Sequence, residues 1–155
     1  MIRVQTEDFD VGREVDALTK GRPGIGAVCV FVGLVRDVAA GEATRAMTLE
    51  HYPKMTTKEL ERIEAEARIR WPLADVLIVH RHGRLELGDR IVLVATASAH
   101  RAAAFQACEF LIDWLKTQAP FWKQEETATG GRWVKAVASD DARAERWDEK
   151  KDRSR

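Results

Sequence analysis

The chain has 155 residues, of which 45% are hydrophobic and 32% are charged, a size and composition that fit one domain with its own core. Its 25 Lys and Arg residues balance 25 Asp and Glu residues, so the net charge is zero. This balance argues against a nucleic-acid-binding protein and against a polybasic membrane-surface protein, because both usually carry a basic excess.

The first half of the chain predicts alternating strands and helices. The expected elements are a strand over 2–5, a helix from Thr6 or Asp8 to Leu18, strands over 27–32 and 46–51, and a helix over 57–70. The run 27–32 is continuous and rich in β-branched residues, which is typical of a buried strand. Thr56 and Glu59 have the spacing of a capping box and predict the start of the second helix. The loop from Asp37 to Thr44 is expected to be mobile.

The second half predicts two strands, a long helix and a hairpin. The expected elements are strands over 76–82 and 90–97 with a turn over 83–89, a helix from its N-cap Ser98 to Gln118, and paired strands over 121–126 and 132–137. Helical spacing predicts that Phe105, Cys108, Ile112 and Leu115 point inward. The expected class is therefore α+β, with two long helices and a mainly antiparallel sheet.

The last 18 residues differ in composition from the rest. Residues 1–137 read as a single domain, whereas residues 138–155 are almost wholly charged or small. Such a tail is expected to be mobile or ordered only against a partner. Trp147 lies where no core is expected, which suggests a docking segment. The other tryptophans are expected in the core; they are Trp71, Trp114, Trp122 and Trp133.

The cysteines and the hydropathy favour a cytoplasmic protein. Cys29 and Cys108 lie in apolar runs outside any CxxC motif, so we expect reduced core thiols. We see no signal peptide, and no apolar run approaches the roughly 20 residues of a membrane span.

An imidazole and a guanidinium stand at the start of the long helix. The N-terminus of a helix favours anions, and Arg101 beside His100 adds a two-pronged donor for phosphate or carboxylate. Acidic residues would suit this position better, so the pair indicates an anion site. The alternative is a surface arginine next to a histidine that only packs.

Two lysines flank the end of the same helix. Lys116 lies in the last turn, where the helix dipole favours a cation without any further role. Lys123 follows two aromatic residues on an extended segment, where it could be partly desolvated. Desolvation lowers the pKa of a lysine and suits it to acid–base or Schiff-base chemistry. Spacing alone leaves the structural and the reactive interpretation open.

The histidines do not predict a metal site. His80 and His82 share a strand face, but no third ligand is placed by spacing, and catalytic zinc usually has three protein ligands. Gly24 and Gly26 lack the third glycine of a dinucleotide-binding fingerprint.

Five stretches, taken in this order and spacing, together resemble the MoaE family, the large catalytic subunits of molybdopterin synthase. They are Phe31–Arg36, Leu49–Met55, His80–Gly83, Ser98–Arg101 and Leu115–Lys123. The resemblance extends from about residue 3 to Trp147. It implies an α/β hammerhead fold and a homodimer in which each copy binds a small ubiquitin-like sulfur-carrier subunit of the MoaD type, giving a heterotetramer.

The resemblance also implies the reaction. The partner's Gly-Gly C-terminus carries a thiocarboxylate, and two sulfur transfers convert cyclic pyranopterin monophosphate (precursor Z) to the dithiolene of molybdopterin. Because the partner supplies the sulfur, no cofactor, no metal and no nucleophilic cysteine of this chain is implied.

The resemblance assigns roles to particular residues. The implied catalytic residues are Lys116 and Lys123. The implied substrate-binding residues are Leu34, Val35, Arg36, His100, Arg101, Lys116, Lys123, Gln124 and Glu125, and Phe31 is expected to line the channel for the partner's tail. We expect the basic members to form one patch around the phosphate. Two alternatives remain on the residues alone: a non-catalytic module that grips an anion, and an enzyme that forms a Schiff base.

Overall fold

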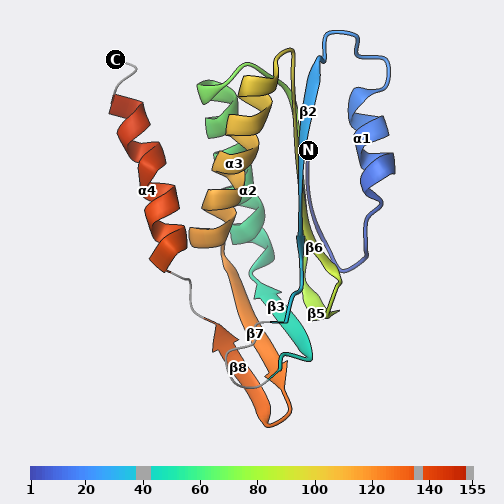
Figure 1. The fold of residues 1–155 in the computed structure, drawn as a ribbon, viewed down its shortest axis with the longest axis vertical. Helices are drawn as coiled ribbons and strands as arrows, with labels where there is room; N and C mark the ends of the chain where they lie inside the picture. Colours follow the sequence, from blue (N-terminus) through green and yellow to red (C-terminus); the bar gives the residue numbers. More distant parts are fainter. Residues whose placement is uncertain (38–42, 135–137, 153–155) are drawn as a thin grey trace.

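The computed structural model describes residues 1–37, 43–134 and 138–152, and within these it contains two four-stranded sheets and four helices (Figure 1). The elements in chain order are β1 (Ile2–Gln5), α1 (Val11–Thr19), β2 (Ala27–Leu34), β3 (Ala46–His51), α2 (Pro53–Arg70), β4 (Leu73–Arg81), β5 (Gly83–Glu86), β6 (Arg90–Ser98), α3 (Arg101–Thr117), β7 (Phe121–Thr127), β8 (Gly130–Val134) and α4 (Ala138–Asp152). The predicted α+β class is confirmed.

The first sheet has the strand order β1-β4-β6-β2, and its pairs are antiparallel except β1 with β4. Helix α1 lies on one side of this sheet, and α2 and α3 lie on the other (Figure 1). The central strand β6 serves both sides: Val94 packs in the cluster with α2 and α3, whereas Leu93 packs in the cluster with α1. Strand β2 therefore forms one edge of a sheet that is covered on both faces.

The second sheet has the order β5-β3-β7-β8 and lies beyond the end at which β2 finishes (Figure 1). All its pairs are antiparallel. Strand β7 leaves α3 after only three residues, so the C-terminus of the long helix is tied directly to this sheet. Strand β5 occupies part of the segment predicted as a turn, because its backbone finds hydrogen-bond partners on β3.

The helix starts differ from the capping predictions. Helix α1 is capped by Asp10, whose side chain accepts a hydrogen bond from the first turn, rather than by Thr6 or Asp8. Helix α2 starts earlier than expected, at Pro53, a residue whose fixed φ suits the first turn. Ser98 is the last residue of β6 and not the N-cap, because the helix begins at Arg101 with His100 as its N-cap; the Ser98 hydroxyl donates to the Pro72 carbonyl at 2.8 Å.

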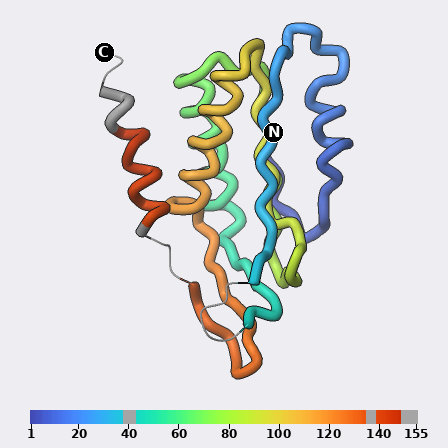
Figure 2. Tube along the Cα trace, in the orientation of Figure 1, coloured from blue at the N-terminus to red at the C-terminus, as the bar shows by residue number. Residues whose placement is uncertain are grey.

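Helix α4 lies alongside α3 on the side away from the first sheet (Figures 1 and 2). Its Trp147 is only 4% exposed and packs edge-on against Trp71 and Phe110, with ring centroids 5.6 and 5.5 Å apart. The indole Nε1 donates to buried Asp113 at 2.8 Å. The expectation that no core reaches this residue is wrong, since a single large side chain anchors an otherwise polar helix.

Three aromatic residues expected in the core are instead exposed. Trp122 on β7 is 42% exposed, Trp133 on β8 is 54% exposed, and Phe105 on α3 is 61% exposed. The strand register places both tryptophans on the same face of the second sheet, the face that does not carry Lys123.

Two predictions extend to residues outside the described ones: the mobility of the loop 37–44, and the end of the hairpin at 135–137. Within the part of the chain that the structure describes, no helix is long and apolar enough to cross a membrane.

Candidate active site

Lys123 lies in the middle of β7, opposite Leu49 of β3 and Val134 of β8. Its side chain is half-buried on one face of the second sheet. Burial lowers the pKa of the Lys123 ammonium, and the positive charge of Lys116 lowers it further, while Asp140 and Glu125 act in the opposite direction. The prediction of a partly desolvated lysine at this position agrees with this geometry.

Lys116 reaches the same place from the last turn of α3 and is exposed. The helix ends because Pro120 follows, and the backbone turns into β7 through a hydrogen bond from the Phe121 N–H to the Ala119 carbonyl at 2.8 Å. This short connection holds the two lysines within electrostatic range of each other. Two ammonium groups that repel each other favour a bound anion, which would offset the repulsion.

Beneath the lysines lies a stack of three rings that sequence reasoning did not assign to the site. Buried His80 stacks on Phe121 with ring centroids 3.7 Å apart, and His51 lies on the same phenyl ring at 5.7 Å. Burial lowers the pKa of His80 to about 3, and the nearby Lys123, His51 and Lys116 charges lower it as well. The signal in the sequence is a histidine, His80, near the end of an apolar strand.

Arg36 lies at the same end of the molecule as the lysines. Val35 is buried with Leu49 in one apolar cluster, and Leu49 is the residue that pairs with Lys123. The Val35 N–H donates to the Asp89 carbonyl at 2.9 Å, which fixes the chain just before the exposed Arg36. The Val35 side chain is only 2% exposed and cannot contact a substrate. Its role is to hold this segment against the core.

The residues after Lys123 point to different faces of β7. Glu125 shares the face of Lys123, is buried, and is paired with Arg132 at 2.7 Å. Gln124 lies on the opposite face, over Gly131. The structure thus brings Glu125 but not Gln124 to the lysine side of the sheet.

His100 and Arg101 lie at the far end of α3 from Lys116. Lys116 lies fifteen positions after Arg101 in the same helix, which corresponds to about 22 Å along the axis. The strand register agrees, because Ser98 pairs with Ala27 at the start of β2, whereas Arg36 follows its end. The expected single basic patch is therefore not formed within one chain: His100 and Arg101 are exposed at the opposite end from the lysines.

Phe31 lines a pocket of about 350 Å³ between the edge strand β2 and helices α3 and α4. The lining residues are Cys29, Val30, Phe31, Phe105, Cys108, Glu109, Ile112, Asp113 and Arg143. Most of this wall is apolar, and the two cysteines in it are free thiols. Burial raises the pKa of the Cys108 thiol, so this sulfur is a poor nucleophile.

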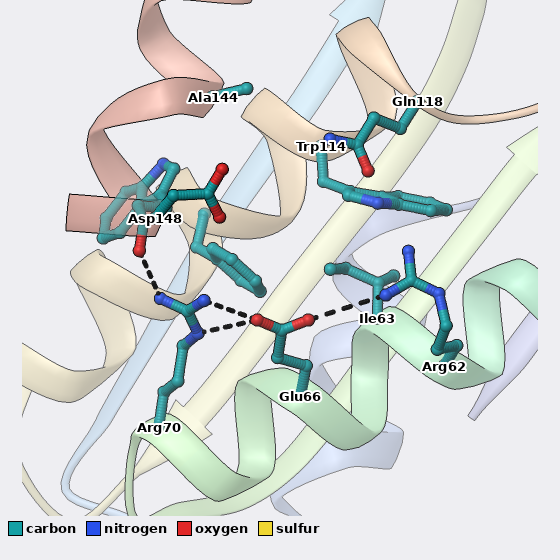
Figure 3. A pocket seen from close by; sticks show the side chains of 10 residues that line it. Arg62, Ile63, Glu66, Arg70, Trp114, Gln118, Ala144 and Asp148 are labelled. Atoms are coloured by element: carbon teal, nitrogen blue, oxygen red, sulfur yellow. Dashed lines mark hydrogen bonds and ion pairs between the residues drawn. The ribbon is translucent and has the colours of Figure 1, made fainter. Parts of the chain in front are cut away.

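A second pocket, of about 250 Å³, lies between α2, α3 and α4 (Figure 3). Arg70 and Arg62 reach Glu66 from two sides, at 2.5 and 3.6 Å, and Arg70 also donates to the Trp147 carbonyl at 2.9 Å (Figure 3). Because both arginines are paired with Glu66, this pocket holds α4 in place rather than offering a charge to an anion.

The histidines do not gather into a metal site in the described part of the chain. The rings of His51 and His82 lie 4.5 Å apart, while His80 faces Phe121. Among residues 1–37, 43–134 and 138–152, no group of three or more His, Cys, Asp or Glu side chains is placed to hold a metal ion.

Comparison with known proteins decides the family. The family model described as "MoaE protein" matches residues 4–118 of the chain. The chain belongs to the MoaE family. A "Molybdopterin synthase catalytic subunit" from Pseudomonas aeruginosa is 57% identical to this MoaE chain over 148 residues, covering 96% of the chain and 99% of the relative.

Solved structures agree with the MoaE assignment. The "Molybdopterin biosynthesis MoaE protein" from Burkholderia ambifaria is 56% identical, covers 95% of this chain and 97% of its own, and gives a TM-score of 0.81. A "protein-protein complex of subunit 1 and 2 of Molybdopterin-converting factor" from Helicobacter pylori covers 86% of this MoaE chain and 90% of its own, with a TM-score of 0.72, but is only 20% identical and supports the fold alone.

Proposed function

We propose that the chain is the catalytic subunit of a molybdopterin synthase, which transfers sulfur to cyclic pyranopterin monophosphate in the biosynthesis of the molybdenum cofactor. The observation that carries the proposal is the pair of lysines, with Lys123 half-buried and its pKa lowered by burial, in a chain whose relatives are named for this activity. The sulfur arrives as the thiocarboxylate of a small partner, so the chain needs no cofactor or metal of its own. We place the reaction in the cytoplasm, where its free cysteines stay reduced.

Lys116 and Lys123 act on the reacting groups. A lysine with a lowered pKa exchanges a proton more readily near neutral pH than an exposed one does. The ammonium form stabilises negative charge that develops at the attacked carbonyl of the thiocarboxylate or on the phosphate. Arg36, exposed at the same end, adds a donor for the phosphate.

A second copy of the chain completes the substrate site. Within one chain, His100 and Arg101 lie about 22 Å from Lys116 along α3, too far to share one small substrate. In a two-fold homodimer each copy can present its helix start to the other copy's lysines, since such interfaces are reciprocal. The exposed start of α3 supports this arrangement.

The small partner is a ubiquitin-like protein of the MoaD type, and two of them on the homodimer give a heterotetramer. The pocket between β2 and α3 supports a route for its Gly-Gly tail, because Phe31 and neighbouring apolar side chains line it. Glycine has no side chain and fits such a passage. The related Helicobacter pylori structure is a complex of two subunits, which fits this partnership.

The test is a reconstitution of sulfur transfer from purified components. The chain is mixed with a thiocarboxylated partner and precursor Z, and dithiolene-bearing pterin is assayed by its fluorescent oxidation product. Wild type is expected to form product, whereas Lys116→Ala and Lys123→Ala are expected to lose at least about a hundredfold in rate. Lys58→Ala, which removes an exposed lysine of α2, serves as the control and should keep full activity.

Two other outcomes would replace the proposal. A folded chain that binds partner and precursor Z without forming product would be a binding module, and its lysines would be helix-end and surface charges. Covalent trapping of the substrate on Lys123 by borohydride would instead indicate Schiff-base chemistry.

A further inference from the structure

His80 is a buried histidine beside the candidate lysines to which the proposed sulfur transfer gives no role. It lies near the end of β4 and alternates with Val76 and Ile78, which pack in the cluster with α2 and α3. Its side chain is therefore directed to the side of the sheet on which α3 runs down to Lys116. A polar ring in such a place needs a physical reason.

Two contacts fix the imidazole. Its ring lies nearly parallel to Phe121, with 12° between the planes and 3.7 Å between the centroids. Its Nδ1 lies 2.8 Å from the Arg81 carbonyl oxygen, which can only accept, so Nδ1 carries the proton of the neutral ring. Both the position and the tautomer of His80 are therefore set by its surroundings.

Phe121 connects this imidazole to Lys123. The two β7 residues are two positions apart and so lie on the same face, about 7 Å from each other. Phe121 contacts both His80 and His51, whose ring centroids lie 3.7 and 5.7 Å from its own. These ring contacts hold the start of β7 in place. They therefore also set the position of the Lys123 backbone.

We propose that His80 is a positioning residue for Lys123: its neutral ring, stacked on Phe121, places the Lys123 ammonium and keeps water from its inner side. This inference rests on the proposed catalytic role of Lys123. It assigns to His80 no contact with substrate and no transfer of a proton.

The charges around His80 agree with a neutral role. Burial holds the pKa of His80 near 3, and the positive charges of Lys123, His51 and Lys116 act in the same direction, against the hydrogen bond to Arg81. The ring is therefore uncharged wherever the protein works. A carboxylate in the same place would pair with Lys123 and raise the pKa of that lysine, whereas a neutral ring leaves the effect of burial intact.

The residues around Lys123 come from five elements: α3, α4, β3, β8 and β7 itself. Lys116 of α3 lowers its pKa, and Asp140 of α4 and Glu125 of β7 raise it. Its partners across the strands, on β3 and β8, are the uncharged Leu49 and Val134. Since burial is the largest cause of the lowered pKa, loss of the His80 ring should raise it by admitting water.

The experiment measures the pKa of Lys123 directly. Competitive labelling with a limiting amine-reactive reagent between pH 6 and pH 11, read by mass spectrometry, follows the reactivity of this one lysine. His80→Ala is expected to raise the pKa of Lys123 toward that of an exposed lysine and to lower the rate of sulfur transfer about tenfold to a hundredfold. His80→Phe keeps a stacked ring and should restore most of both properties.

Two further variants separate positioning from simple packing. Val76→Ala opens a cavity on the same face of β4 away from Phe121, and should leave the pKa of Lys123 unchanged. If His80→Ala does not fold, Phe121→Leu removes the same stack from the other side and should shift the pKa in the same direction.

The outcomes distinguish this inference from the proposed function. An unchanged Lys123 pKa in folded His80→Ala and Phe121→Leu proteins would overturn the positioning role. A second outcome combines two variants: the pKa of Lys123 is raised in His80→Ala, but the Lys123→Ala protein still transfers sulfur. This result would uphold the positioning of Lys123 by His80 and overturn the catalytic role proposed for Lys123.

Discussion

The candidate site gathers basic groups that disfavour one another's charges. Lys116 and Lys123 each lower the pKa of His80, and Lys116 also lowers that of Lys123. Such a group of residues costs stability in the unliganded protein, and an anionic ligand offsets that cost when it binds. At the level of single side chains, the site therefore favours a bound anion, as the proposed function requires.

His80 predicts how the stability of the fold depends on acid. Its pKa is about 3 in the folded chain and about 6.5 for an unperturbed histidine, so between these values the unfolded chain binds a proton that the folded chain does not. The free energy of unfolding should therefore fall as pH drops below about 6.5, by roughly 2–3 kcal/mol from this group at pH 4.5. His80→Phe does not titrate, so urea unfolding at pH 7 and 4.5 should show a smaller loss for it. Equal losses in both proteins would contradict the assignment.

The cysteines make a second prediction at this scale. Burial raises the pKa of Cys108, and Cys29 lies beside it in the wall of the same pocket. In the proposed function the partner supplies the sulfur, so the double variant Cys29→Ala with Cys108→Ala should transfer sulfur within about twofold of wild type. A variant that folds and binds the partner but forms no product would show that a thiol of this chain takes part.

At the scale of elements, periodicity predicted most strands and helices, and tertiary contacts decided what it could not. The strands over 2–5 and 46–51 were placed correctly because their patterns are local. Ser98 was predicted as the helix cap, but that position falls on His100, and the Ser98 hydroxyl donates to the Pro72 carbonyl. Strand β5 has no pattern of its own and exists because β3 pairs with it. Trp122 and Trp133 share a strand face, yet the sequence does not say that this face is open.

Helix α4 shows the same limit and carries a prediction. Composition predicted a mobile tail, but Trp147 and the pair of Arg146 with Asp113 at 2.7 Å attach it to α3. Trp147→Ala removes a buried indole and should cost about 3–5 kcal/mol of stability. This loss is larger than the free energy that holds a surface helix without such an anchor, so α4 should detach while the rest of the chain stays folded. Hydrogen exchange over 138–152 should rise strongly, whereas Glu145→Ala, an exposed change on the same helix, should leave it unchanged. Protection retained in Trp147→Ala would mean that other contacts hold the helix.

At the scale of the whole molecule, the sequence predicts which residues belong to the candidate site better than it predicts their positions relative to one another. Lys116 and Lys123 were predicted together, and they lie together, because a three-residue connection leaves little freedom between α3 and β7. His100 and Arg101 were expected in the same patch. Their separation from Lys116 already followed from the predicted length of the helix between them, about 1.5 Å for each residue. The ring stack under Lys123 needed the fold, since His80, His51 and Phe121 come from three separate strands.

A site shared between two copies predicts complementation between inactive variants. Lys116→Ala and Arg101→Ala should each abolish sulfur transfer in a homodimer, because every site then lacks one of the two groups. When the two proteins are unfolded together and refolded as a mixture, half of the dimers are mixed, and in each of these one site receives Lys116 and Arg101 intact. Activity should therefore return to about a quarter of wild type, given a symmetric two-fold dimer. If Lys116 and Arg101 acted within one chain, mixing their variants would restore no activity. A mixture of Lys116→Ala and Lys123→Ala proteins is the control. Both changes fall in the same half of the site, so this mixture should stay inactive in either case.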